Sequence, residues 1–200
     1  MTLSSVVSYH WTASCNTAIK HINIYSPIFN ICNVHPNNDT HVQDTHATLQ
    51  CITGYQFNDE KLLYRALTRY AWAKEQDLAA DAHMDALATL GDAVIELIVL
   101  DALVHAGITE KGEISKIKMN SVNMSVLRRL AEQLQLHKFV YWGKGEANMQ
   151  IWTSGRVLAE CMEALIGAIY LDGSINDAKN VLQNCGFFKT IPAIHTYSSK

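Results

Sequence analysis

The sequence lacks the features that mark several large classes of protein. It has no Cys-x-x-Cys pair, and its five cysteines are odd in number and widely spaced, so we expect neither a disulfide framework nor a zinc site. Only 18% of its 200 residues are charged, and the net charge of −3 argues against a uniformly basic nucleic-acid-binding surface. Hydrophobic residues make up 48% of the chain, which is enough to bury the core of one domain.

The sequence shows no sign of a membrane-spanning segment or a cleaved leader. Its most apolar segment, residues 93–100, contains Glu96 and is followed by Asp101, so it is much shorter than the roughly 18 uncharged residues that a span requires. The first charge is Lys20 and no arginine precedes Arg65, which argues against secretory and mitochondrial leaders. We therefore expect a cytoplasmic protein without membrane contact, and a Ser/Thr-rich organellar leader is the alternative.

The residue pattern changes near residue 51 and divides the chain into two parts. Residues 1–50 hold only three charged side chains but five of the nine histidines, whose spacing does not suit a metal site. We expect this part to be a poorly structured extension and linker. From Phe57 onward, apolar residues recur with a helical period and without strand-like alternation. We predict an all-α helical bundle over residues 51–188, followed by a tail over residues 189–200.

We expect five or six helices in this domain. One long helix is predicted from about Asp81 to Ala106, and a very apolar one from about Gly155 to Asp172. Further helices are expected to begin near Asn58, Thr109, Ser125 and Ile175.

Acidic residues share one face on each of the two long helices. Asp85, Asp92 and Glu96 lie on one stripe of the first helix. Glu160 and Glu163 are three residues apart on the second, which is otherwise almost entirely apolar. A single acid on a helix most often faces solvent, but the apolar neighbours of Glu163 leave it little polar surface to occupy.

If the two helices meet, Asp92, Glu160 and Glu163 converge. Three close carboxylates repel one another unless a hard divalent cation compensates their charge, and Mg²⁺ or Mn²⁺ is the natural candidate. Such a cluster can activate water for phosphodiester hydrolysis. An unrelated helical metal-binding protein is the alternative interpretation of these residues.

Charge is distributed unevenly along the domain. Residues 111–144 carry a local charge of +5, whereas residues 74–101 carry −6. Basic side chains of this kind neutralise phosphates and position a duplex, so the segment is a candidate RNA-binding surface, although a solubilising helix face fits the charge alone equally well. The candidate RNA-binding residues are Lys111, Lys116, Lys118, Arg128, Arg129 and Lys144.

Two segments resemble the ribonuclease III endonuclease domain. Residues 83–94 are similar to the hallmark of that family, with Leu87, Leu90, Gly91 and Asp92 in common. Residues 158–173 resemble the second acidic helix of the family almost residue for residue. The likeness extends over about residues 53–185.

The resemblance implies a homodimer that cuts double-stranded or structured RNA with Mg²⁺, for which Mn²⁺ can substitute. The products would carry 5′-phosphate and 3′-hydroxyl ends, and a ribosomal or other precursor RNA is a candidate substrate. Asp92 and Glu163 would be the catalytic acids, and Asp92, Glu160 and Glu163 the metal ligands. Asp85 and Glu113 match other acids of the family and would be supporting acids; Glu96, one turn after Asp92, is a further candidate by its spacing alone.

The sequence departs from the family pattern at three points. Ala88 stands where the hallmark has a metal-binding glutamate, and Arg69 stands where histidine is usual. We expect no double-stranded-RNA-binding domain after Cys185, and therefore weak and salt-sensitive duplex binding. Because of Ala88, the alternative function is a catalytically impaired RNA-binding or ribosome-associated protein on the same scaffold.

Overall fold

The computed structural model describes residues 39–191, with side chains from residue 45 onward, and this range forms helices and loops without a β-strand. The α-helices are α2 (Asp39–Thr53), α3 (Glu60–Leu67), α4 (Tyr70–Glu75), α5 (Asp85–His105), α6 (Lys111–Ser121), α7 (Met124–Gln133), α8 (Lys144–Asn148), α9 (Gly155–Asp172) and α10 (Ile175–Asn184). Short 3₁₀ helices are η2 (Leu136–Lys138), η3 (Ile151–Thr153) and η4 (Phe187–Thr190). The predicted all-α class is confirmed.

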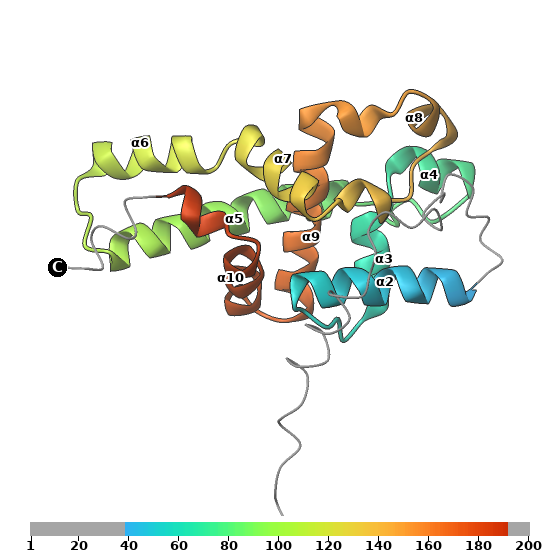
Figure 1. Cartoon of the computed structure of the whole chain (residues 1–200), viewed down its shortest axis with the longest axis horizontal. Helices are drawn as coiled ribbons and strands as arrows, with labels where there is room; N and C mark the ends of the chain where they lie inside the picture. The colour runs from blue at the N-terminus through green and yellow to red at the C-terminus, as the bar shows by residue number, and fades with distance from the viewer. Residues whose placement is uncertain (1–38, 192–200) are drawn as a thin grey trace, which may run out of the picture. The chain divides into compact units, whose positions relative to one another are not determined.

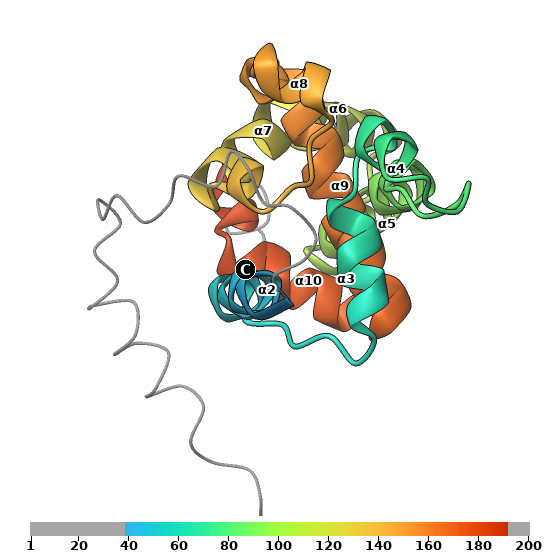
Figure 2. The same cartoon turned by 90° about the vertical axis from the view of Figure 1, so that its right-hand side faces the viewer.

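Helix α9 lies at the centre of the described domain. It packs against α3, α5, α7 and α10, which surround it in two perpendicular views (Figures 1 and 2). A helix that is apolar on nearly every side must be buried, which explains why this segment became the core. Its buried residues extend from Val157 to Ile169 and are interrupted only by the half-buried Glu160 and Glu163.

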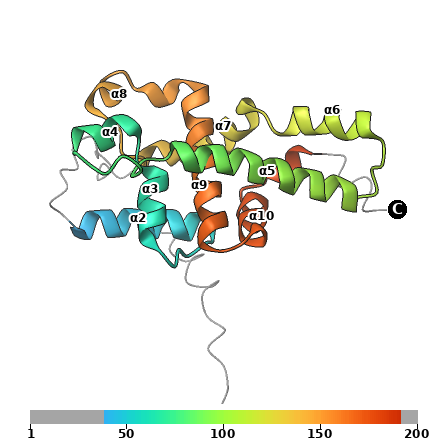
Figure 3. The same ribbon diagram turned by 180° about the vertical axis from the view of Figure 1, so that it is seen from behind.

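Helix α5 crosses α9, and α6 runs back beside α5 (Figure 3). Two ion pairs hold neighbouring helices to α5. Lys118 Nζ of α6 lies 2.9 Å from Glu96 Oε1, and Lys179 Nζ of α10 lies 3.3 Å from Asp101 Oδ2. Within residues 39–191, no helix is long and apolar enough to cross a membrane.

Helix α2 corrects the expectation that residues 1–50 form an extension and linker, since residues 39–50 belong to this helix. Its buried face is largely polar, with His46 and Gln50 each 5% exposed beside the buried Leu49. Gln50 accepts a hydrogen bond from the backbone N–H of Phe57, and His46 Nε2 is hydrogen-bonded to the Tyr141 hydroxyl. Apolar periodicity therefore gives little sign of this helix. Residues 1–38, including the first three histidines, lie outside the described range, as do residues 192–200.

The C-terminal end of α9 is fixed to the loop before α3. The carboxylate of Asp172 accepts hydrogen bonds from the backbone N–H groups of Asn58 (2.7 Å) and Asp59 (2.8 Å) and from the Tyr55 hydroxyl (2.8 Å). Burial alone would raise the pKa of Asp172, but these hydrogen bonds to the charged form outweigh it and lower the pKa. This clamp sets the position of α9 relative to the α2–α3 loop.

Two cysteines of the described range, Cys161 and Cys185, are free thiols.

Candidate functional site

The site is built around the point where α5 and α9 cross, and two glycines set how closely they approach. A Cβ atom on Gly91 of α5 would overlap the backbone carbonyl of Glu163. A Cβ atom on Gly167 of α9 would overlap the backbone carbonyl of Leu87. Because both positions lack a side chain, the two helix backbones come into direct contact there.

This contact brings acids of the two helices together. Asp92 follows Gly91 on α5 and is exposed, while Glu163 lies on α9 and is half-buried. The pKa of Glu163 is raised to about 7 by burial and by the negative charges of Asp92 and Glu160, and Arg156 counteracts part of this effect. The repulsion shows that the three acids form one electrostatic group.

Two arginines hold the third acid. Arg156 Nε lies 3.0 Å from Glu160 Oε1, one helical turn away on α9. Arg69 Nη1 lies 3.5 Å from Glu160 Oε2. Glu160 is therefore oriented by cations on two elements rather than directed freely toward Asp92 and Glu163.

Arg69 is shared with a second carboxylate. Its Nε and Nη2 atoms lie 3.0 Å and 2.9 Å from Oε1 of Glu146 on α8. The other oxygen of Glu146 accepts a hydrogen bond from the backbone N–H of Gly143 at 3.2 Å. The side chains of Arg69 and Glu146 are only 15% and 12% exposed, so this pair is well shielded from solvent.

The three candidate supporting acids lie on two helices, Asp85 and Glu96 on α5 and Glu113 on α6. Asp85 begins α5 and pairs with His83, with Nδ1 and Oδ2 3.4 Å apart. Glu96 lies one turn after Asp92 and is paired with Lys118. Glu113 lies in the first turn of α6 and is exposed.

Ala88 is buried in the face that α5 turns toward the core, at 8% exposure. Because Glu96 and Asp85 both have basic partners, their carboxylates are already engaged elsewhere. Neither is positioned in this structure as a free substitute for an acid at position 88.

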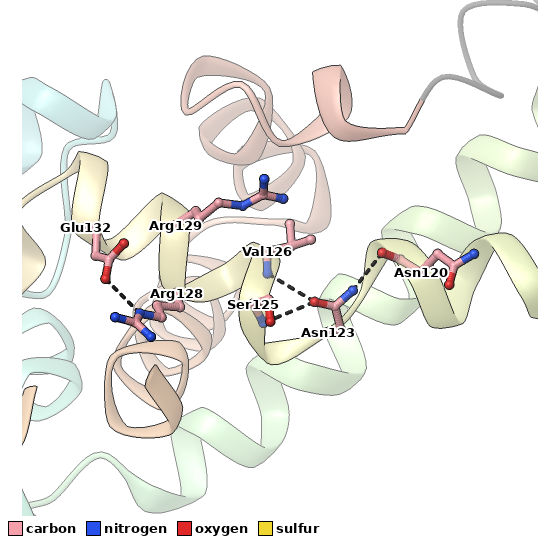
Figure 4. Close-up of a pocket in the computed structure, with 7 residues that line it drawn as sticks. All are labelled: Asn120, Asn123, Ser125, Val126, Arg128, Arg129 and Glu132. Atoms are coloured by element: carbon pink, nitrogen blue, oxygen red, sulfur yellow. Dashed lines mark hydrogen bonds and ion pairs between the residues drawn. The ribbon is translucent and has the colours of Figure 1, made fainter. Parts of the chain in front are cut away.

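The candidate RNA-binding residues are spread over α6, α7 and α8. Arg128 and Arg129 line an open pocket of about 700 Å³ between α6 and α7. Arg128 Nε lies 2.7 Å from Glu132 Oε1, while the guanidinium of Arg129 points away from that pair (Figure 4). The exposed side chains of Lys111, Lys116 and Lys144 lie on α6 and α8.

Asn123 forms the floor of this pocket by capping α7. Its Oδ1 accepts hydrogen bonds from the backbone N–H groups of Ser125 and Val126, and its Nδ2 donates to the carbonyl of Asn120 (Figure 4). The cap fixes the start of α7 and with it the direction of both arginines.

Sequence reasoning singled out Arg69 as a departure from the family pattern but did not place it in the site, and it missed Glu146. The two residues are 77 positions apart, so no helical spacing links them. The available signal was the Glu146 carboxylate three residues after Gly143, the residue before α8, because a glutamate at this position can accept a hydrogen bond from the N-cap N–H, as it does here.

The donor set suits a hard divalent cation by its chemistry, because it consists of carboxylate oxygens with excess negative charge. Within residues 39–191, however, no group of three or more His, Cys, Asp or Glu side chains is arranged to hold a metal ion as it stands. The ion pairs of Glu160 account for part of this arrangement.

Comparison with known proteins gives a consistent result. Residues 59–187 match the family model described as Ribonuclease-III-like. Ribonuclease 3 of Bdellovibrio bacteriovorus is 37% identical over 143 residues, covering 71% of this chain and 61% of that protein. Ribonuclease 3 of Pasteurella multocida is 35% identical over 137 residues, covering 68% and 58%. The chain thus spans about three fifths of the length of these relatives.

Solved structures of the nuclease domain of ribonuclease III from Campylobacter jejuni have the same fold. One has a TM-score of 0.64 and 29% identity and covers 72% of this chain and 97% of its own; its description mentions a region involved in dimer formation. A second has a TM-score of 0.64 and 28% identity and covers 73% and 95%. The similarity therefore extends over nearly the whole of those nuclease domains.

Proposed function

The chain belongs to the Ribonuclease-III-like family, and we propose that it is an endoribonuclease that hydrolyses phosphodiester bonds in double-stranded or structured RNA. The observation that carries this proposal is the proximity of the carboxylates of Asp92 and Glu163 beside the glycine contact of α5 and α9. In this proposal the products carry 5′-phosphate and 3′-hydroxyl ends, and precursor RNA is the substrate.

We place the divalent cation, Mg²⁺ or Mn²⁺, on the carboxylates of Asp92, Glu160 and Glu163. When bound, such an ion supplies Lewis acidity and lowers the pKa of coordinated water. The protein's own contribution is the proximity of the acids. Burial and the negative charges of Asp92 and Glu160 raise the pKa of Glu163 to about 7 in the metal-free site, so a bound cation relieves this repulsion.

The RNA would approach across the basic side chains of α6, α7 and α8. Lys111, Lys116, Arg129 and Lys144 are exposed, and they are the residues we propose for phosphate contacts. Lys118 is a weaker candidate because Glu96 neutralises its charge.

The binding-only alternative is not favoured. Asp92, Glu160 and Glu163 are all retained, and two of them lie in a helix whose core position has no structural need for acids. The relatives named Ribonuclease 3 support the enzyme. In this proposal Ala88 lowers the affinity of the site for the divalent cation but does not abolish binding.

Cleavage of a long duplex RNA by the full chain tests this proposal. We expect metal-dependent production of short fragments that stops when a chelator is added. The variant Asp92→Asn should lower the rate by at least about 100-fold, because it removes a charged ligand from the site. Asp101→Asn changes an acid of the same helix outside the site and serves as the matched control. Duplex RNA that stays intact at all Mg²⁺ and Mn²⁺ concentrations would contradict the proposal.

We also propose a homodimer formed through the exposed face of α5. Leu97 and Val104 are 52% and 60% exposed and share one side of the helix with the exposed Ala93. Monomeric proteins rarely leave such apolar stripes in water.

Light scattering on the purified chain tests the dimer. We expect about twice the chain mass of 22.3 kDa for the wild type and a single chain mass for Leu97→Glu, since a charge at the centre of an apolar interface is not tolerated. Met149→Glu, at a site 71% exposed on another face, is the matched control and should remain dimeric. A monomeric wild-type chain would rule the interface out.

A further inference from the structure

Arg69 is the one arginine in residues 39–191 that connects a site acid to a carboxylate outside the site. It lies immediately before α4 and contacts Glu146 of α8 and Glu160 of α9. The two carboxylates share one guanidinium group and therefore compete for it. Its contact with Glu146 is the closer one, at 2.9 Å, and its contact with Glu160 is 3.5 Å long.

The backbone around Arg69 is fixed from two sides. The N–H of Arg69 donates to the carbonyl of Tyr141 at 3.2 Å, and the N–H of Tyr141 donates to the carbonyl of Leu67 at 2.8 Å. The N–H of Met84 donates to the carbonyl of Thr68 at 2.9 Å. Because the main chain cannot move freely, the guanidinium stays close to Glu160.

The surroundings of the guanidinium also keep it in place. It lies 5.9 Å from the centre of the Trp142 ring, and Nη1 lies 3.9 Å from the sulfur of Met84. A cation with these neighbours is largely screened from water, so its field at Glu160 is stronger than that of a surface arginine.

We propose that Arg69 is a positioning residue that competes with the divalent cation for Glu160, and that Glu146 limits this competition by holding Arg69. This inference rests on the proposed function, since it concerns the cation of the same site. In the absence of metal, Glu160 is paired with Arg69 and with Arg156. A cation must therefore displace an existing ion pair to recruit this carboxylate.

Opposite effects of two substitutions follow from this competition. Arg69→Gln removes a positive charge beside Glu160, so we expect Mn²⁺ to bind about tenfold more tightly. Glu146→Gln removes the competing negative charge and leaves the guanidinium to Glu160, so we expect Mn²⁺ to bind several-fold more weakly. Glutamine at position 146 keeps an oxygen that can still accept the hydrogen bond from the N–H of Gly143.

The measurement is a calorimetric titration of the full chain with Mn²⁺ in the absence of RNA, with circular dichroism to confirm folding. A merely structural clamp would shift both affinities in the same direction, because either variant would loosen the same contact. That result, or two unchanged affinities, would overturn the inference.

Three further variants make the test specific. Arg69→Lys keeps the positive charge but cannot bridge both carboxylates as the guanidinium does, so its Mn²⁺ affinity should lie between those of the wild type and Arg69→Gln; tightening equal to that of Arg69→Gln would overturn the inference. Lys179→Gln breaks the pair with Asp101 outside the site and should leave the affinity unchanged. If Arg69→Gln does not fold, the double variant with Glu146→Gln leaves no unpaired buried charge and should bind Mn²⁺ more tightly than the wild type.

Failure of the inference can be told apart from failure of the proposed function. A wild-type chain that binds no Mn²⁺ at millimolar concentration would contradict both the proposed function and the role of Arg69. Binding by the wild type without opposite shifts in the two variants would remove only the role of Arg69.

Discussion

The variant Gly91→Ala is expected to lose about 3 kcal/mol or more of unfolding free energy, because the added methyl group would occupy the backbone carbonyl of Glu163. The nearest atoms are main-chain atoms of α9, so no side chain can rotate to make room. The two helices must separate, and with them Asp92 and Glu163.

The same substitution elsewhere separates this effect from helix propensity. Gly112 lies in α6 with nothing within 4 Å of an added Cβ, so Gly112→Ala should stabilise the domain by up to about 1 kcal/mol. Urea unfolding followed by circular dichroism measures both changes. Equal midpoints for Gly91→Ala and the wild type would mean that Gly91 does not set the distance between the helices.

Sequence patterns predicted the two helices that carry the acids but not all of their surroundings. Helix α9 begins and ends where the apolar run does, whereas α5 begins at Asp85 rather than near Asp81. The preceding residues form turns and bends, and Met84 at their end lies with its sulfur 3.9 Å from Arg69 Nη1. Periodicity cannot detect such a boundary, because the apolar stripe continues through the turn.

The short helices show the same limit. Helices α4 and α8 have six and five residues, too few for a periodic signal to appear. They nevertheless position Arg69 and Glu146, whose contact depends on tertiary packing. The acidic residues could be predicted from the sequence because they repeat along a helix, and the arginine that restrains one of them could not.

The variant Glu163→Gln is expected to raise stability while it removes activity. The folded state raises the pKa of Glu163 from 4.5 to about 7, so the folded protein binds this proton more tightly than the unfolded chain does. As the pH rises from 4.5 through 7, the wild type must ionise a carboxyl group that burial and two neighbouring acids disfavour, and its stability falls. Glutamine carries no such penalty.

We expect no difference between the two proteins below about pH 4.5, and an advantage of about 1–2 kcal/mol for Glu163→Gln at pH 8 without divalent metal. This value allows for screening by water, because the side chain is only half-buried. Thermal unfolding at both pH values in chelator measures the difference. Glu160→Gln is the matched control, and it should not stabilise the protein because it breaks the pairs with Arg69 and Arg156.

The same experiment connects stability with function. Adding Mg²⁺ or Mn²⁺ at pH 8 should stabilise the wild type and erase the advantage of Glu163→Gln, because a ligand that binds only the folded state shifts the unfolding equilibrium. Duplex cleavage by the variant should fall by at least about 100-fold, since a charged ligand is lost. A variant that is less stable than the wild type at pH 8 would show that Glu163 is not under electrostatic strain, and that the acids of α5 and α9 do not form a site that favours a cation.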